Sequence, residues 1–65
     1  MFGNNVHNQR LAKGFTQEFL AEEAGISQVQ IARIESGKLN TSISTVVSIA
    51  KALNIEVGEL FKSAN

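Results

Sequence analysis

The sequence contains no cysteine, so neither a disulfide nor a cysteine-based zinc site can support the fold. Proline, tryptophan and tyrosine are also absent, and the single histidine, His7, leaves little for acid–base chemistry. No apolar run approaches the roughly 18 residues of a membrane-spanning helix, and the N-terminus shows no signal-peptide pattern. These absences disfavour an enzyme, a metal protein and a membrane protein. We therefore expect a cytoplasmic protein without a metal or cofactor.

The size and charge of the chain set a second boundary. With 65 residues, 43% of them hydrophobic and 18% charged, the composition predicts one small globular domain over residues 1–65. Six lysines and arginines balance six acidic residues, so the formal net charge is zero. This balance argues against nucleic-acid binding, which usually depends on a surplus of positive charge. A DNA-binding hypothesis therefore needs a localised positive field.

Glycines divide the chain into stretches with helical patterns. Gly14, Gly25 and Gly37 each follow such a stretch, and each suits the left-handed conformation that ends many helices. The first stretch runs from Phe2 to about Lys13. The spacing of the glycines therefore predicts three short helices in the first 37 residues.

Two of these stretches carry N-terminal signals. The second begins after Thr16, a residue type that caps helices, and its Phe19 and Leu20 are expected to face the core. The third begins at Ser27, with Gln30 three residues later. This is the capping-box pattern, in which each of the two side chains accepts a hydrogen bond from the other residue's backbone.

Two further helices are expected after residue 42. The segment from Ile43 to Leu53 is rich in Ser, Thr, Val and Ile, for which local propensity favours a strand. Its apolar residues nevertheless recur at intervals of three and four, which predicts a helix. A last short helix is expected over about 57–62. The sequence thus predicts an all-α fold, a compact domain of five helices.

The second and third helices, over about residues 17–36, have the spacing of a helix-turn-helix with a tight turn at Gly25. Ile31 and Ile34 define the buried side of the third helix. The opposite side, including its exposed first turn, has no acid and consists of Gln28, Val29, Ala32, Arg33 and Ser36. Glutamine can bond adenine, arginine can bond guanine, and small apolar groups can contact thymine methyls. This face therefore indicates recognition of the DNA major groove.

The chain resembles the lambda-repressor-like helix-turn-helix family of Cro and XRE-type regulators. The resemblance is carried by Thr16-Gln17-Glu18-Phe19-Leu20-Ala21, Gly25-Ile26-Ser27, Ile31-Ala32-Arg33-Ile34-Glu35-Ser36-Gly37-Lys38, Ala50-Lys51-Ala52-Leu53-Asn54-Ile55 and Glu59-Leu60-Phe61. It covers about residues 6–62. It implies a transcriptional regulator that places residues 28–36 in the major groove of double-stranded operator DNA.

The same resemblance assigns roles to individual residues. It implies base contacts for Gln28, Val29, Ala32 and Arg33. It implies contacts with the DNA backbone for Thr16, Gln17, Ser27, Ser36, Lys38 and Asn40. Arg10 and Glu35 match a partly buried salt bridge of some members, and Thr41 stands where the family usually has proline.

The expected number of phosphate contacts bears on the oligomeric state. A monomer with about 3–5 such contacts should bind weakly at physiological salt. Tight binding therefore requires a homodimer on a pseudo-palindromic operator, with half-sites about 34–36 Å apart. Val57 and Phe61 are the expected dimer contact. Repression is the default role, and activation from an adjacent site is the alternative.

A second class of function is a protein-interaction module on the same fold, such as the antitoxin of a toxin–antitoxin pair. The neutral charge and the apolar C-terminal end favour this alternative. An enzyme is disfavoured because the chain offers no nucleophile with a base beside it. His7 is expected on the surface of the first helix.

Overall fold

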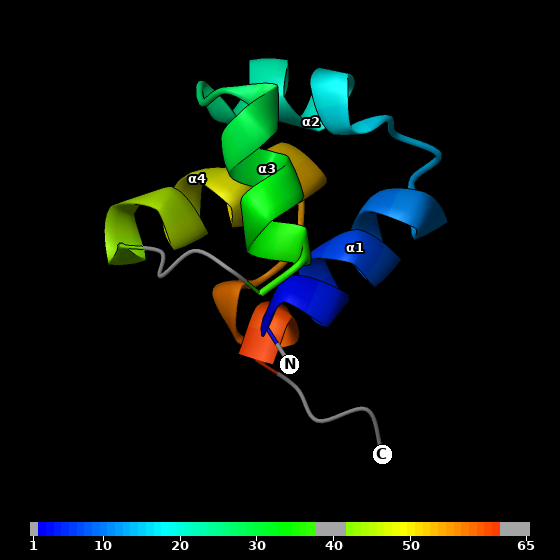
Figure 1. Cartoon of the computed structure of the whole chain (residues 1–65). Helices are drawn as coiled ribbons and strands as arrows, with labels where there is room; N and C mark the ends of the chain where they lie inside the picture. The colour runs from blue at the N-terminus through cyan, green and yellow to red at the C-terminus, as the bar shows by residue number, and fades with distance from the viewer. Residues whose placement is uncertain (1, 38–41, 62–65) are drawn as a thin grey trace.

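The computed structural model describes residues 2–37 and 42–61, which form an all-α fold (Figure 1). In chain order, the elements are α1 (Phe2–Ala12), α2 (Gln17–Ala24), α3 (Gln28–Glu35), α4 (Ile43–Leu53) and η1 (Val57–Phe61). The expectation of five helices is corrected to four α-helices in these ranges, because η1 is a 3₁₀ helix. Its backbone bond from Glu59 N to Glu56 O spans three residues, the tighter pattern that very short helical segments adopt.

Local hydrogen bonds fix where the helices begin. Thr16 Oγ1 accepts a hydrogen bond from Phe19 N at 3.0 Å, which confirms Thr16 as the N-cap of α2. The predicted capping box is also confirmed: Ser27 Oγ accepts from Gln30 N, and Gln30 Oε1 accepts from Ser27 N, both at 3.1 Å. Ser42 caps α4 in the same way. These side chains satisfy backbone N–H groups that a first helical turn leaves without partners.

Left-handed residues close the helices as expected. Gly14, Gly25 and Gly37 have φ angles of 73°, 73° and 77°. Asn54 closes α4 in the same region, with φ 57°. Gly25 in particular makes the tight turn that sets α3 relative to α2, because a side chain there would be strained at this φ.

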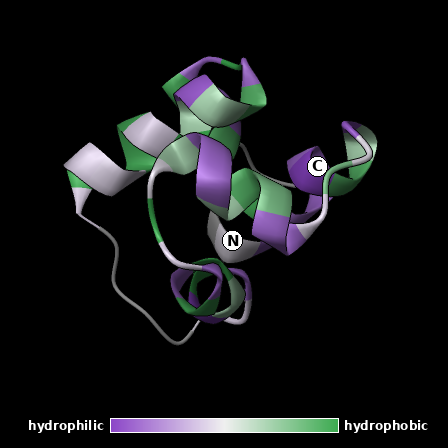
Figure 2. Ribbon diagram, turned by 90° about the horizontal axis from the view of Figure 1, so that it is seen from above, coloured by the Kyte–Doolittle hydropathy of each residue, from purple (hydrophilic) through white to green (hydrophobic). Residues whose placement is uncertain are grey.

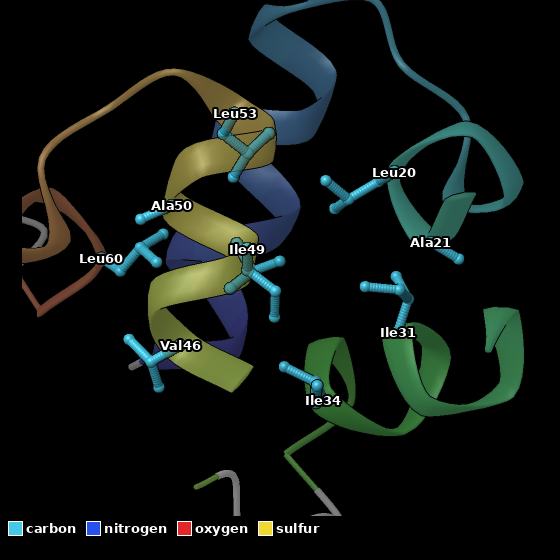
Figure 3. Close-up of a cluster of buried hydrophobic side chains, with 10 residues drawn as sticks. Leu20, Ala21, Ile31, Ile34, Val46, Ile49, Ala50, Leu53 and Leu60 are labelled. Atoms are coloured by element: carbon cyan, nitrogen blue, oxygen red, sulfur yellow. The ribbon is translucent and has the colours of Figure 1, made fainter. Parts of the chain in front are cut away.

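One hydrophobic core joins the five elements (Figure 3). Its members are Val6, Leu20, Ala21, Ile31, Ile34, Val46, Ile49, Ala50, Leu53 and Leu60. In Figure 3, Leu20, Ile31, Ile34 and Ile49 point into the space between α2, α3 and α4, whereas Val46 and Ala50 project from the other side of α4, toward Leu60. Four of the core residues lie on α4, which confirms that its periodicity, and not its strand propensity, decides its structure.

Phe19 departs from the expected core, because its side chain is 42% exposed. Leu20 and Ala21 occupy the buried face of α2 instead. Leu20 and Ala21 define the buried face between them, and Phe19 lies about 150° around the helix from its midpoint, so its side chain points outward. The Phe19 ring packs edge-on against Phe15, with ring centroids 4.6 Å apart. Figure 2 shows how hydrophilic and hydrophobic residues alternate along the ribbon.

Candidate nucleic-acid interface

The side of α3 away from the core is accessible. Gln28, Val29, Ala32, Arg33 and Ser36 are all exposed, and Val29 is 61% exposed. The last four of these residues line an open hollow of about 510 Å³. On the opposite side of α3, Ile31 and Ile34 are buried in the core, so the packing of the helix directs the accessible face outward.

The polar groups of this face differ in what they already bind. The side chains of Gln28 and Arg33 make no hydrogen bond or ion pair with another residue of the described ranges, so their donors are free to meet a ligand. Ser36 Oγ, in contrast, donates to the backbone oxygen of Arg33 at 2.9 Å. Because a phosphate needs a donor, the Ser36 hydroxyl would have to rotate before it could bind one.

Two further candidates for contacts with the DNA backbone are the N-cap residues. The exposed Thr16 uses its side-chain oxygen as an acceptor, which leaves the hydroxyl proton for a phosphate. Ser27 Oγ lies 3.4 Å from Gln30 Oε1, so its proton is directed at the capping box. Lys38 and Asn40 lie outside the described residues.

Gln17, the first residue of α2, is half-buried. Its Nε2 donates to Glu35 Oε1 across a distance of 3.2 Å. The family resemblance implies a contact between Gln17 and the DNA backbone, and in the structure its side chain also bonds to the end of α3. A side-chain amide carries two N–H groups, so one remains for another acceptor.

Glu35, at the end of α3, is the centre of a hydrogen-bonded cluster. Arg10 Nε donates to Glu35 Oε2 at 2.8 Å, and Arg10 Nη2 donates to Oε1 at 3.1 Å. His7 Nδ1 lies 2.9 Å from the same Oε1. The side chains of Glu35 and Arg10 are only 5% and 10% exposed. The cluster therefore links α1, α2 and α3 through one buried carboxylate.

The electrostatics of the cluster favour an ionised Glu35. Burial by itself would raise the pKa of this carboxyl. The hydrogen bonds from Arg10, His7 and Gln17, together with the charge of Arg10, outweigh burial and hold the Glu35 pKa below its ordinary value. At neutral pH the Glu35 side chain is consequently a carboxylate, which can only accept hydrogen bonds.

Sequence reasoning missed two members of this cluster, His7 and Gln17. The spacing of His7 and Arg10, three residues apart on one helix, could have placed His7 beside Arg10. The expectation that His7 is a surface residue describes only part of it: its side chain is 45% exposed, but Nδ1 meets Glu35. No local pattern signals that contact, because His7 and Glu35 are 28 residues apart.

The residues expected at a dimer interface differ in exposure. Val57 is half-buried and packs against the core. Phe61, four residues later, is 52% exposed. Phe61 is therefore the one of the two that offers more apolar surface to a partner.

Residues 2–37 and 42–61 contain no group of three or more His, Cys, Asp or Glu side chains that could hold a metal ion. No helix in this part of the chain is long and apolar enough to cross a bilayer. Within the described residues, the exposed face of α3 is the candidate binding surface.

Comparison with known proteins identifies the family. A helix-turn-helix family model matches residues 6–60. The chain belongs to the Cro/cI-like helix-turn-helix family. The family consists of DNA-binding transcriptional regulators and is not a family of enzymes.

Three relatives illustrate the relationship. The control protein C.SmaI of Serratia marcescens is 35% identical over 60 residues, which are 92% of this chain and 71% of that protein. The immunity repressor protein of Bacillus phage phi105 is 36% identical over 58 residues, 89% of this chain and 40% of that protein. The crystal structure of the restriction-modification controller protein C.AhdI of Aeromonas hydrophila superposes with a TM-score of 0.91 at 38% identity, covering 92% and 87% of the two chains. The chain is accordingly a DNA-binding transcriptional regulator of the helix-turn-helix type.

Proposed function

We propose that this protein is a sequence-specific transcriptional repressor that places α3 in the major groove of a pseudo-palindromic operator as a homodimer. The observation that carries the proposal is the exposed, acid-free face of α3. On this face the amide of Gln28 and the guanidinium of Arg33 make no hydrogen bond or ion pair to other described residues. Unpaired donors on an accessible helix are what readout of base edges requires.

The base contacts are divided between polar and apolar groups. Gln28 lies in the first turn of α3, where a side chain can bond adenine N6 and N7. Arg33, one turn further, would bond guanine O6 and N7. Val29 and Ala32 lie between them and would contact thymine methyl groups. The mixture of groups makes α3 able to distinguish base pairs, beyond simply neutralising phosphates.

Contacts with the DNA backbone would come from the ends of the two helices. The first turn of α2, capped by Thr16 and begun by Gln17, presents backbone N–H groups and a free hydroxyl proton to a phosphate. The other proposed backbone residues are Ser27, Ser36, Lys38 and Asn40. Because these contacts carry no base preference, they would fix the position of α3 and leave specificity to its exposed face.

The neutral net charge makes a dimer necessary for tight binding. Two copies double the number of phosphate contacts and of base contacts, whereas one copy has too few for strong binding at physiological salt. Val57 and Phe61 on η1 are the proposed contact between the copies. Occupation of an operator that overlaps a promoter would then block transcription.

Selection from a randomised pool of duplex DNA at low salt, read by sequencing, tests the proposal. Enrichment of an inverted repeat whose halves are about 34–36 Å apart would support it and would give the bases opposite Gln28 and Arg33. Failure of a folded protein to enrich any sequence would contradict it. That result would favour a protein partner, such as the toxin of a toxin–antitoxin pair, which a pull-down with the neighbouring gene products would reveal.

A further inference from the structure

We propose that His7 is a further residue of the DNA-backbone contact, and that it binds a phosphate as an imidazolium whose Nδ1 is held by Glu35. This inference rests on the proposed function, because it adds one ligand to the same protein–DNA contact. It implies that the protein takes up a proton at His7 when it binds DNA.

His7 lies next to Gln17 in the cluster around Glu35. His7 Nδ1 and Gln17 Nε2 both contact Glu35 Oε1, at 2.9 Å and 3.2 Å, so these two nitrogens are no more than about 6 Å apart. Gln17 begins α2, whose N-terminus is the proposed phosphate site. His7 therefore lies at the border of the same site, although it belongs to a different helix.

The side chain of His7 is only partly buried in the cluster. Its side chain is 45% exposed although Nδ1 is in contact with a carboxylate that is only 5% exposed. Nδ1 is the ring nitrogen engaged in the cluster, and Nε2 makes no hydrogen bond to another described residue. An anion bound at Nε2 would therefore displace no hydrogen bond of the cluster.

The ionisation of Glu35 decides which ring nitrogen carries a proton. An ionised carboxylate can only accept, so the 2.9 Å contact requires a proton on His7 Nδ1. The alternative, in which Nδ1 accepts from Arg10 Nη2 at 3.2 Å, is the longer contact and would set a lone pair against Glu35. With the Nδ1 proton in place, a neutral ring has only a lone pair at Nε2, which cannot bond a phosphate. Phosphate binding thus needs a second ring proton.

The charged groups that face His7 come from two helices. The Glu35 carboxylate on α3 and the Arg10 guanidinium on α1 both lie against Nδ1 of the ring. Gln17 on α2 is uncharged. A phosphate at Nε2 adds a second negative charge beside the ring, so DNA binding and protonation of His7 should favour each other.

Dissociation constants measured between about pH 5.5 and 8.5 on the operator obtained by selection test the inference. Imidazole side chains lose their proton in this range. We expect the affinity of the protein to fall roughly 3- to 10-fold per bound monomer as pH rises across it. The slope of log K against log salt concentration should also be steeper at low pH by about 0.9 per monomer, the signature of one additional neutralised phosphate.

Two variants separate the role of His7 from other sources of pH dependence. His7→Gln cannot titrate, and we expect it to bind at every pH as the wild type does at high pH. His7→Lys carries its charge throughout the range, and we expect it to keep the steeper salt slope at both ends. Because the chain has a single histidine, pH dependence that persists in His7→Gln would belong to another group, such as the terminal amine.

The outcomes distinguish this inference from the proposed function. Specific binding with the same affinity and salt slope at all pH values would overturn the role of His7 and leave the proposed function intact. Persistence of the pH dependence in His7→Gln would also overturn it. Absence of binding to any duplex at any pH would contradict the proposed function itself, and the inference with it. Thermal unfolding of each variant followed by circular dichroism verifies that the proteins compared are folded.

Discussion

Glu35 is the residue on which the contacts between three helices depend. Its carboxylate accepts hydrogen bonds from Arg10 and His7 on α1 and from Gln17 on α2. The Arg10 guanidinium also donates to the backbone oxygen of Phe15 at 2.8 Å, so the turn between α1 and α2 is held by the same group. The cluster is nearly excluded from water on the Arg10 and Glu35 side.

Removal of one member of the buried pair should be costly. We expect Glu35→Leu to lower the free energy of unfolding by about 3–5 kcal/mol, because the buried charge of Arg10 loses its partner. The double variant Arg10→Met/Glu35→Leu should lose clearly less than the two single variants together. Urea denaturation followed by circular dichroism measures all three, and strictly additive losses would show that the pair is not coupled.

Acid should weaken the fold through Glu35. Its pKa is lowered in the folded state, so it contributes stability above its unfolded pKa of about 4.3 and loses that contribution as pH falls through the folded value. We therefore expect stability to decline below about pH 4 and Glu35→Gln to reduce this decline. Exposed Glu22→Gln is the matched control. An unchanged pH profile in Glu35→Gln would contradict the assignment.

Gln28 should determine specificity at one base pair. We expect Gln28→Ala to reduce the preference at that base pair by about 1–3 kcal/mol while binding to other sequences changes little. Binding of the variant to a set of single-base operator variants measures this preference. A uniform loss across all sequences would show that Gln28 contacts the backbone instead of a base.

Site residues on one helix can be predicted from the sequence, and contacts between helices cannot. Helical spacing from the buried Ile31 and Ile34 was enough to orient the exposed face of α3. The ties of Glu35 to His7 and Gln17 join residues 28 and 18 positions apart, and no periodicity carries that information. Whether the exposed face contacts bases stays a prediction, since it depends on a DNA complex.

At the scale of the elements, α1 approaches α3 closely at Gly3. A Cβ atom added at Gly3 would overlap the backbone oxygen of Ile34 and lie 3.1 Å from that of Glu35. We expect Gly3→Ala to lower the free energy of unfolding by about 1–3 kcal/mol and to weaken DNA binding, because α3 must shift. Gly58→Ala meets no atom within 4 Å and should change stability by less than about 0.5 kcal/mol. Equal effects of the two substitutions on chemical denaturation would contradict this interpretation.

The helices themselves were largely predictable because their signals are local. Ser27 and Gln30 mark the start of α3, and the spacing of apolar residues identifies α4 despite its β-branched composition. The final element was predicted in place but not in type. A segment of five residues is short enough for the tighter 3₁₀ pattern, and its sequence carries no signal that distinguishes this pattern from an α-helix.

At the scale of the whole molecule, self-association should depend on the exposed end of η1. We expect Phe61→Ser to weaken dimer formation and to lower operator affinity at least tenfold, because Phe61 offers apolar surface to a partner and is 52% exposed. Leu11→Ser, on α1 and 56% exposed, is the matched control. Sedimentation equilibrium with and without operator measures association. A Phe61→Ser protein that pairs as the wild type does would show that the interface lies elsewhere.

The hydrogen bond from Asn5 Nδ2 to the backbone oxygen of Leu60, 2.7 Å long, joins residues 55 positions apart. It joins the first turns of α1 to η1, whose Leu60 is fully buried, so the first and last elements of the described chain are held together. Local opening of η1 would expose the N-terminal half of α1 as well, and the two segments should exchange their amide hydrogens as one cooperative unit. Amides of α4, which contributes four residues to the core, should exchange only through global unfolding.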